Sequence, residues 1–368
     1  MTRRTALAAS IAAAAVRASA ANSAINVGLL GTGNRGPYVA GFMAKHTPAK
    51  IAALCDLSEA KMVKAKASIG AENPRLYTDF RKMLESDIDA IIIATPVFLH
   101  VEHFEAALKA GKHIYLEKPA SIDVAGCKRI MTLADAADRK LNITFGFQRR
   151  YAELYRKGKA IVDSGAIGPI RLGHAKFIKS DGAPAEPTPR PRTEREKIEQ
   201  WGHWKELSGD LIVENNIHSI DVLNWFLGGR PASAIGAGGT VARTNGDMRD
   251  HNFVAFEYAG GVQGQLTGIT VAPPGYRDVS EQFFGEKGMI ETSENFLRHF
   301  KGQGNETVEK TPRNITIDAV TEFVKRIADG KPENTAVRGA ESTLTAILGR
   351  MAMDQRREVT WAEMMKQG

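Results

Sequence analysis

The sequence predicts a two-domain α/β protein, in which a doubly wound parallel sheet precedes an α+β domain with a mostly antiparallel, open sheet. The chain has 368 residues, which is more than one domain of ordinary size. Short apolar runs alternate with helical segments over residues 25–147, a pattern typical of a parallel sheet covered on both faces. Over residues 148–368, strand-like segments follow one another across short turns, which favours antiparallel pairing.

Hydrophobic periodicity predicts the elements of the first domain. Strands are expected at residues 25–30, 51–55, 90–94, 113–116 and 143–147. Helices are expected at residues 37–45, 58–68, 80–85, 101–110 and 121–139. The regular alternation places a helix between successive strands, as a parallel sheet requires.

The second domain begins with a helix predicted over residues 151–164. Its strands are expected at residues 170–177, 232–240, 252–258, 262–270 and 280–284. A glycine-containing turn at residues 259–261 joins two of these strands as a hairpin. Three helices complete the domain, at residues 317–328, 339–357 and 361–366.

Residues 181–195 form a predicted surface loop of unusual length. The segment contains Pro184, Pro187, Pro189 and Pro191 among charged residues, and this density of proline excludes a helix or a central strand. Two interpretations stay open. The loop is either an exposed connection without a role, or a lid or subunit-contact arm near the substrate.

Composition and charge exclude several classes of protein. The chain is 43% hydrophobic and 25% charged, with a net charge of +7, and it has no tract of Lys and Arg. These values are typical of a soluble globular protein without a nucleic-acid partner. The two cysteines, Cys55 and Cys127, are too few for a disulfide framework and lack metal-ligand spacing. We expect both to be buried apolar residues, and we expect no metal site.

Residues 1–24 are predicted to be an export signal and leader. The arginine pair Arg3-Arg4 precedes a short apolar run at residues 6–16, and Ala18-Ser19-Ala20 has the small residues of a cleavage site. The segment resembles a twin-arginine signal, which implies export of the folded protein to the bacterial periplasm. Without a functional signal the protein would be cytoplasmic. No other apolar stretch is long enough to span a membrane.

A glycine motif follows the first predicted strand and precedes a helix, namely Gly31-Thr32-Gly33-Asn34-Arg35-Gly36. In this context it predicts a dinucleotide site of Rossmann type, with the pyrophosphate at the helix N-terminus. Asp56 ends the second strand twenty residues after Gly36. A carboxylate there accepts hydrogen bonds from ribose hydroxyls and repels a 2′-phosphate, so NAD is favoured over NADP. The alternative role for Asp56 is as a helix cap.

Two further segments, Thr95-Pro96 and Glu117-Lys118-Pro119, directly follow the strands predicted at residues 90–94 and 113–116. Ligands of open parallel sheets bind outside the carboxyl ends of strands, so both segments point to the nicotinamide end. Together with His100 and with Gly111-Lys112-His113, they resemble the Gfo/Idh/MocA oxidoreductase family. The resemblance extends over residues 25–368 and is strongest over residues 25–150.

The resemblance implies that Lys118 contacts both cofactor and substrate. An ammonium beside a reacting alcohol stabilises developing alkoxide charge, which agrees with this role. The candidate cofactor-binding residues are Gly31, Gly33, Asn34, Arg35, Gly36, Asp56, Thr95, Pro96, His100, Glu117 and Lys118.

A second motif covers residues 208–221 and carries Glu214, His218 and Asp221. On one helix these spacings place the three side chains on one face, beside an apolar stripe. With the resemblance, His218 is the candidate general base, while Glu214 and Asp221 orient the substrate or the imidazole. From spacing alone, a helix with a polar face and a satisfied histidine is the better explanation. The family has aspartate at the position of Glu214 and a small residue at that of Asn216, which leaves the substrate open.

Gln148, Arg150 and Trp204 are the candidate substrate-binding residues. The first two follow the last strand of the first domain, where the family places a substrate-side residue. Tryptophan faces stack well on the C–H surfaces of sugars, although Trp204 and its neighbour Trp201 serve core packing equally well. His203 and His251 are expected to be structural.

The predicted function is hydride transfer between nicotinamide and a sugar, polyol or sugar derivative. Alternatives are an NAD-dependent glycosidase that oxidises its substrate transiently, and an NAD-binding sensor without activity. Free NAD is scarce outside the cytoplasm, so we expect a tightly bound, recycled cofactor. We also expect a homo-oligomer, a dimer or tetramer, that covers the open face of the second sheet.

Overall fold

The computed structural model describes residues 24–181 and 186–367. A six-stranded parallel sheet forms the first domain, with the order β3-β2-β1-β4-β5-β6. The strands are β1 (Asn26–Leu30), β2 (Lys50–Cys55), β3 (Arg75–Tyr77), β4 (Ala90–Ile93), β5 (His113–Leu116) and β6 (Ile143–Phe145). This order belongs to a doubly wound Rossmann sheet and confirms the predicted fold.

The sequence pattern missed only β3 in this sheet. Its three residues lie at the sheet edge, and two of them are exposed. A short edge strand needs no apolar run, so hydrophobic periodicity gives no signal for it.

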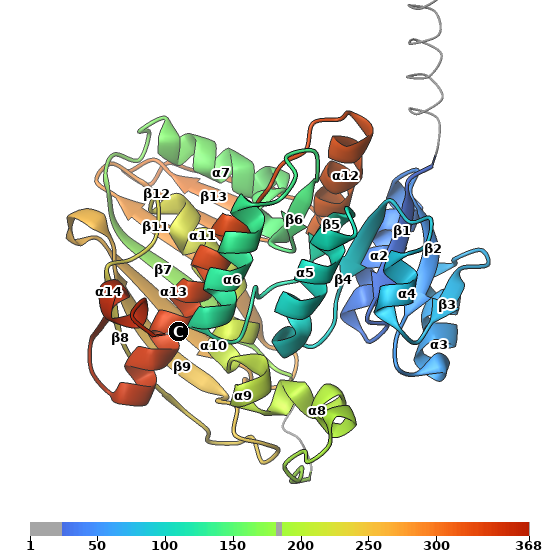
Figure 1. Ribbon diagram of the computed structural model, residues 1–368. Coiled ribbons are helices and arrows are strands. Elements are labelled where there is room, and N and C mark those ends of the chain that lie inside the picture. The colour runs from blue at the N-terminus through green and yellow to red at the C-terminus, as the bar shows by residue number, and fades with distance from the viewer. Residues whose placement is uncertain (1–23, 182–185, 368) are drawn as a thin grey trace, which may run out of the picture.

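Helices cover both faces of the first sheet (Figure 1). They are α2 (Arg35–His46), α3 (Glu59–Ile69), α4 (Phe80–Leu84), α5 (His100–Lys109) and α6 (Val124–Asp135), with the short 3-10 helices η1 (Val97–Leu99) and η2 (Gln148–Arg150) at the strand ends. A helix from much later in the chain, α12 (Ile315–Ala328), also packs on this sheet. Its Phe323 ring meets Tyr115 of β5 edge-on at a centroid distance of 5.6 Å. The C-terminal part of the chain therefore contributes to the core of the first domain.

A nine-stranded sheet forms the second domain, with the order β14-β13-β12-β11-β7-β10-β9-β8-β15. All its strand pairs are antiparallel except β7 with β10, which confirms a mostly antiparallel sheet. The strands are β7 (Ile170–Lys179), β8 (Ser233–Gly239), β9 (His251–Glu257), β10 (Gln263–Ile269), β11 (Arg277–Gly285), β12 (Met289–Ser293), β13 (Phe296–Phe300), β14 (Glu306–Lys310) and β15 (Val359–Thr360), and the turn between β9 and β10 contains η4 (Ala259–Gly261).

One face of this sheet is covered by α7 (Glu153–Asp163), α11 (Ile217–Phe226) and α13 (Ala336–Gln355), and α14 (Trp361–Met364) follows β15 (Figure 1). Phe226 of α11 stacks on Phe283 of β11 at 4.4 Å between ring centroids. The opposite face carries exposed apolar side chains, among them Ile235, Phe253 and Phe284.

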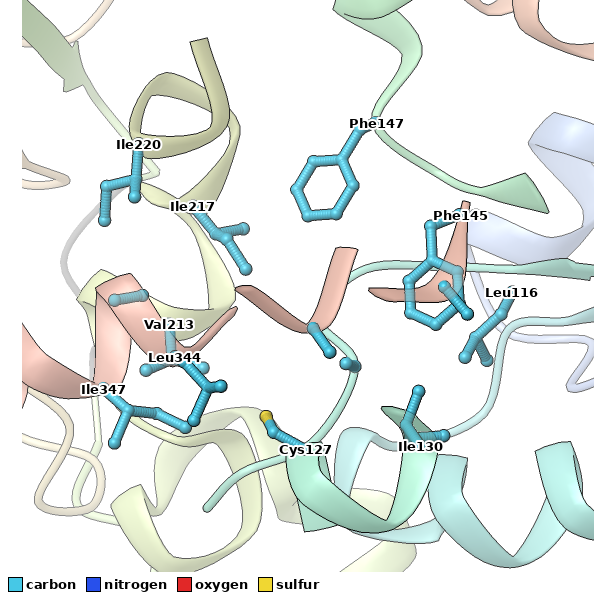
Figure 2. Packing of buried hydrophobic residues seen from close by; sticks show 14 of the residues in the cluster. Leu116, Cys127, Ile130, Phe145, Phe147, Val213, Ile217, Ile220, Leu344 and Ile347 are labelled. Atoms are coloured by element: carbon cyan, nitrogen blue, oxygen red, sulfur yellow. The ribbon is translucent and has the colours of Figure 1, made fainter. Parts of the chain in front are cut away.

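A continuous apolar core joins the two domains. Figure 2 shows Phe147, at the end of the first domain, between Phe145 and the side chain of Ile217 on α11. Leu344 and Ile347 of α13 lie in the same cluster. Shared packing of this kind fixes the two domains relative to each other, and so fixes any site built between them.

Between β7 and α11 the chain forms short helices: α8 (Glu194–Gln200), η3 (Trp201–His203), α9 (Lys205–Ser208) and α10 (Leu211–Glu214). The predicted loop therefore ends at residue 193, because Thr193 and Glu196 form a reciprocal capping box that starts α8. Cys55 and Cys127 are free, buried thiols, and burial raises the pKa of Cys55 to about 12. Residues 1–23, which include nearly all of the predicted export signal, lie outside the described part. Within that part, no helix has the length and hydrophobicity needed to cross a membrane.

Candidate active site

The glycine motif forms a tight turn between β1 and α2. Gly31 has φ +92°, and a Cβ on it would lie 2.5 Å from the carbonyl oxygen of Ala94. A Cβ on Gly36 would lie 2.1 Å from the carbonyl oxygen of Gly31, so packing requires glycine at both positions. At Gly33 a Cβ would meet no described atom within 4 Å, which leaves its backbone open to a ligand.

The N-terminus of α2, preceded by Asn34, has no side-chain hydrogen bond to cap it. Its backbone N–H groups and its dipole are therefore available to an anion. Together with the open backbone at Gly33, this arrangement fits a pyrophosphate.

Asp56 lies at the end of β2 and holds the glycine turn. Its Oδ2 accepts hydrogen bonds from the backbone N–H of Thr32 at 2.8 Å and from the Thr32 hydroxyl at 2.9 Å. Its Oδ1 accepts from the N–H of Ser58 at 3.0 Å, while Ser58 itself caps α3. Asp56 also lines a cavity of about 400 Å³ with Gly31 and Pro96, where an adenosine would lie at the carboxyl edge of the sheet.

A second cavity, of about 310 Å³, lies between the two domains. Thr95 borders both cavities, so they meet at the end of β4. The predicted residues that line this second cavity are Arg35, Thr95, His100, Glu117, Lys118, Gln148, Glu214 and His218. The structure therefore brings together the candidate lysine of the first domain and the candidate histidine of the second.

Lys118 and Glu214 form an ion pair across the domain boundary. The Lys118 Nζ donates to Glu214 Oε1 at 2.9 Å and also to the Glu214 main-chain carbonyl. Their side chains are only 12% and 21% exposed, which strengthens the interaction. Burial alone would raise the pKa of Glu214, but the ammonium outweighs burial and lowers it below its usual value. Glu214 is therefore charged.

His218 is held as a neutral imidazole. Burial lowers its pKa well below 6.5, and the nearby Lys118 and Arg149 cations lower it further. Its ring meets Phe147 edge-on at 6.2 Å between centroids. No described residue hydrogen-bonds to the imidazole, so its nitrogens are available to a ligand. A neutral, unpaired imidazole facing a cavity is suited to accept a proton.

Glu117 and Arg35 form a second ion pair beside the cavity. Arg35 Nε donates to Glu117 Oε1 at 2.9 Å, and Arg35 lies 3.5 Å from Gln148 Oε1 through its terminal nitrogen. Glu117 is 3% exposed, and its Oε2 has no hydrogen-bond partner among the described residues. A buried carboxylate oxygen without a hydrogen-bond partner lowers the stability of the fold. Such an oxygen can accept a hydrogen bond from a ligand hydroxyl, and a nicotinamide ribose offers one.

His100 secures the ends of β4 and β5. Its Nδ1 lies 2.7 Å from the carbonyl oxygen of Pro119, and its Nε2 lies 3.0 Å from that of Thr95. Burial lowers its pKa. Because both ring nitrogens face main-chain oxygens, His100 shapes the cavity wall instead of offering a nitrogen to the cofactor.

The predicted single helix over the second motif is wrong, since the chain breaks it into α10 and α11 at Asn215-Asn216. Asn216 turns away from the cavity, and its Oδ1 accepts from Asn252 on β9 at 2.7 Å. Asn215 lines the cavity instead and donates to Glu214 Oε2.

Asp221 and Arg150 also depart from the expectation, because they pair with each other. Arg150 makes two hydrogen bonds of 2.8 Å to the Asp221 carboxylate, which also accepts from Ser342 at 2.7 Å. Asp221 is 1% exposed and faces α13, while Arg150 lines a separate cavity beside Trp225. Neither side chain borders the cavity that holds His218. The pair joins η2 to α11 instead of contacting a substrate.

Trp204 is likewise not in this cavity. It is 8% exposed, and the Arg190 guanidinium lies 5.5 Å from its ring centroid. Trp201 lines the cavity in its place. His203 and His251 have structural partners, Asn245 and Asp250 respectively.

Sequence reasoning missed five further residues that line the cavity, namely Val97, Phe177, Lys179, Arg277 and Glu294. Val97 follows the motif residues Thr95-Pro96, so its neighbourhood was a usable signal. The other four come from the ends of β7 and β11 and from the residue after β12. Their position depends on the register of the second sheet, which no local pattern reveals.

The fold and the site define a two-domain, NAD-binding oxidoreductase. Models of the Gfo/Idh/MocA oxidoreductases match the chain in both domains, the NAD-binding Rossmann domain over residues 25–145 and the C-terminal domain over residues 155–291. The chain belongs to the Gfo/Idh/MocA family.

Relatives and solved structures agree with this membership. Inositol 2-dehydrogenase of Azotobacter vinelandii is 29% identical over 73% of this chain and 74% of its own. Myo-inositol 2-dehydrogenase of Thermotoga maritima is 24% identical over 93% of this chain and all of its own. A levoglucosan dehydrogenase in complex with NADH and levoglucosan has a TM-score of 0.79 at 20% identity, with 92% and 99% of the two chains covered. At that identity, the last comparison establishes the fold alone.

Proposed function

We propose that this protein is an NAD-dependent dehydrogenase of a cyclic polyol or sugar, acting on a secondary alcohol. One observation carries the proposal: the Lys118 ammonium and the neutral His218 imidazole, from different domains, line the same cavity beside the dinucleotide motif. The relatives that act on inositol support a cyclic polyol as the substrate class.

His218 accepts the hydroxyl proton of the substrate, because its ring is neutral and unpaired among the described residues. Lys118 stabilises negative charge on the substrate oxygen. Glu214 holds the Lys118 ammonium in place through their ion pair. NAD, when bound, accepts the hydride, and Glu117 Oε2 is the residue group available to fix its nicotinamide ribose. In the reverse direction, the same residues return the proton.

The charges around the cavity favour an uncharged substrate. Arg149 is paired with the buried carboxylate of Glu281, Lys179 with Asp181 and Arg277 with Glu294. Arg35 and Lys118 are paired with Glu117 and Glu214. With each of these cations already matched by a carboxylate, a neutral polyol meets no uncompensated charge.

The test is a panel of inositols and sugars incubated with the purified protein and NAD, followed through nicotinamide absorbance. Stoichiometric NADH formation with a cyclic polyol supports the proposal, and His218→Asn should remove it. Release of an aglycone without net NADH formation would contradict the proposal and favour the glycosidase alternative.

Three further proposals concern the environment of the enzyme. We infer that the cofactor stays bound through purification, which mass spectrometry of the denatured protein tests. The residues of the twin-arginine type support export to the periplasm, and fractionation of producing cells tests it. The exposed Ile235, Phe253 and Phe284 on the uncovered sheet face support a dimer or tetramer, which light scattering tests.

A further inference from the structure

Residues 191–203 contain α8 and η3, and Figure 1 shows α8 beyond α9, away from the strands of the second sheet. The two ends of this segment lie close together. Arg190 forms an ion pair with Glu206 at 2.6 Å, and its guanidinium lies over the Trp204 ring. The segment therefore leaves the body of the protein and returns to it at nearly the same point, as a compact Ω-loop does.

The helix in this segment is stabilised by its own residues. Beyond the capping box of Thr193 and Glu196, Arg195 pairs with Glu199, and Lys197 pairs with Glu194. No residue of α8 or of η3 is fully buried, and among the described elements α8 packs closely only against η3. A helix that keeps its shape without tertiary packing can move as a unit.

Two apolar side chains of the segment face the two cavities of the cofactor site. Ile198 lines the cavity of Asp56, Leu57 and Pro96, where it is the only described residue from the second domain. Trp201 lines the cavity of Lys118 and His218. The segment thus crosses the junction between the adenosine and nicotinamide halves of the site.

The base of the segment is fixed on both sides of the crevice. The His203 carbonyl accepts hydrogen bonds from the N–H groups of Asp247 and Met248 in the second domain. The following helix, α9, packs on η1, which directly follows β4 in the first domain. Motion is therefore confined to the part before His203, which carries Ile198 and Trp201.

We propose that residues 191–203 form a clamp over the bound dinucleotide, with Ile198 against the adenosine half and Trp201 beside the nicotinamide half. The clamp must swing away before NAD leaves, so the cofactor exchanges slowly between turnovers. This inference rests on NAD binding, and it does not depend on the proposed substrate.

The test measures NADH release by stopped-flow fluorescence after mixing the loaded protein with excess NAD. Removal of the Ile198 contact in Ile198→Ala should speed release about tenfold, given the contribution of one apolar side chain. Arg192→Ala is the matched control, because Arg192 lies in the same segment with an exposed side chain and contacts α8 through its backbone N–H, which alanine keeps. Release from this control should match the wild-type rate.

Hydrogen exchange of the wild-type protein gives a second readout that needs no variant. NADH should slow exchange of the amides of residues 194–203, and the amides of the exposed strand β14 should not change. Unchanged exchange over residues 194–203, or wild-type release from a folded Ile198→Ala, would overturn the clamp. If the wild-type protein retains NADH in this way but none of the tested polyols leads to reduction of NAD, the result would contradict the proposed function. The clamp would still be supported.

Discussion

At the scale of single residues, the Lys118 ammonium acts on two neighbours at once. It keeps Glu214 charged by direct pairing, and it helps to keep His218 neutral by repelling a second positive charge. The Lys118 cation therefore lowers the pKa of both Glu214, which positions it, and His218, which accepts the proton.

Replacement of Lys118 by methionine should reduce kcat/KM by about 10²–10³-fold, the loss typical of one donor to a developing oxyanion. The same change should raise the pKa of His218, because a nearby positive charge is removed. Steady-state kinetics and NMR titration of the imidazole measure the two effects. Lys179→Met is the control, since this cation also borders the cavity but contributes less to the pKa of His218. An unchanged imidazole pKa in Lys118→Met would contradict the coupling.

The pH profile should report the same imidazole. Because the pKa of His218 lies well below 6.5, the neutral base persists as the pH falls through 6.5. The acid limb of kcat/KM is therefore expected well below pH 6.5, instead of near the ordinary histidine value. Rates with a polyol substrate between pH 5 and 8 measure it. A limb centred at pH 6.5 or above would show that the histidine is solvated.

Sequence reasoning identified Lys118, Glu214 and His218 but misplaced Asp221 and Arg150. The first three follow from motifs at element ends that face the crevice. Asp221 has an equally suitable spacing from His218 on the same helix α11, but its carboxylate faces Ser342 of α13. That contact joins residues 121 positions apart, so no local pattern contains it.

At the scale of elements, the start of α10 stores backbone strain. Asp210 has φ +81° and ψ 168°, a conformation found essentially only for glycine. Its carboxylate compensates by accepting from the N–H groups of Leu211 and Arg249 and by pairing with the Arg249 guanidinium. These interactions of the Asp210 carboxylate fix the start of α10, the helix that ends at Glu214.

Two substitutions of Asp210 should separate the strain from the ion pair. Asp210→Ala removes the buried partner of Arg249 and keeps the strained backbone, at a cost of about 3–5 kcal/mol of unfolding free energy. Asp210→Gly loses the same carboxylate but relaxes the backbone, so it should be more stable than the alanine variant by about 1–3 kcal/mol. Urea unfolding of both variants measures the difference. Equal stability of the two would show that the backbone carries no strain.

Most elements were predictable. The sequence pattern missed the strands β3, β12, β13, β14 and β15, and two of these share a physical cause. β14 is exposed along its whole length and β3 is mostly exposed, so neither has the apolar face that periodicity detects. The sequence pattern does not predict the break between α10 and α11, because Val213, Ile217 and Ile220 are all fully buried and their spacing fits one continuous helix. The buried contact of Asn216 with Asn252 on a distant strand accompanies the break.

At the scale of the whole molecule, the histidines should determine stability toward acid. Seven of the nine have lowered pKa values, with burial as the largest cause in each, and the pKa of His103 falls to about 3. Near pH 6 the unfolded chain therefore binds more protons than the folded protein does, so stability falls as the pH decreases through 6.5.

Thermal unfolding between pH 7.5 and 5.5 measures this effect, and Tm should decrease steadily over that interval. His103→Gln, which removes a strongly shifted group, should reduce the slope. His46→Gln is the control, because His46 is an exposed residue of the last turn of α2. A Tm that is constant or increases toward pH 5.5 would contradict the prediction.

The return of α12 to the first sheet has a consequence for synthesis on the ribosome. Tyr115 is fully buried, and part of its cover is Phe323, which is made more than half a chain later. The nucleotide-binding lobe therefore lacks part of its interior until residues 315–328 have emerged. A nascent chain that stops after residue 147 exposes this aromatic ring to water and to chaperones, and the two lobes reach their final form together.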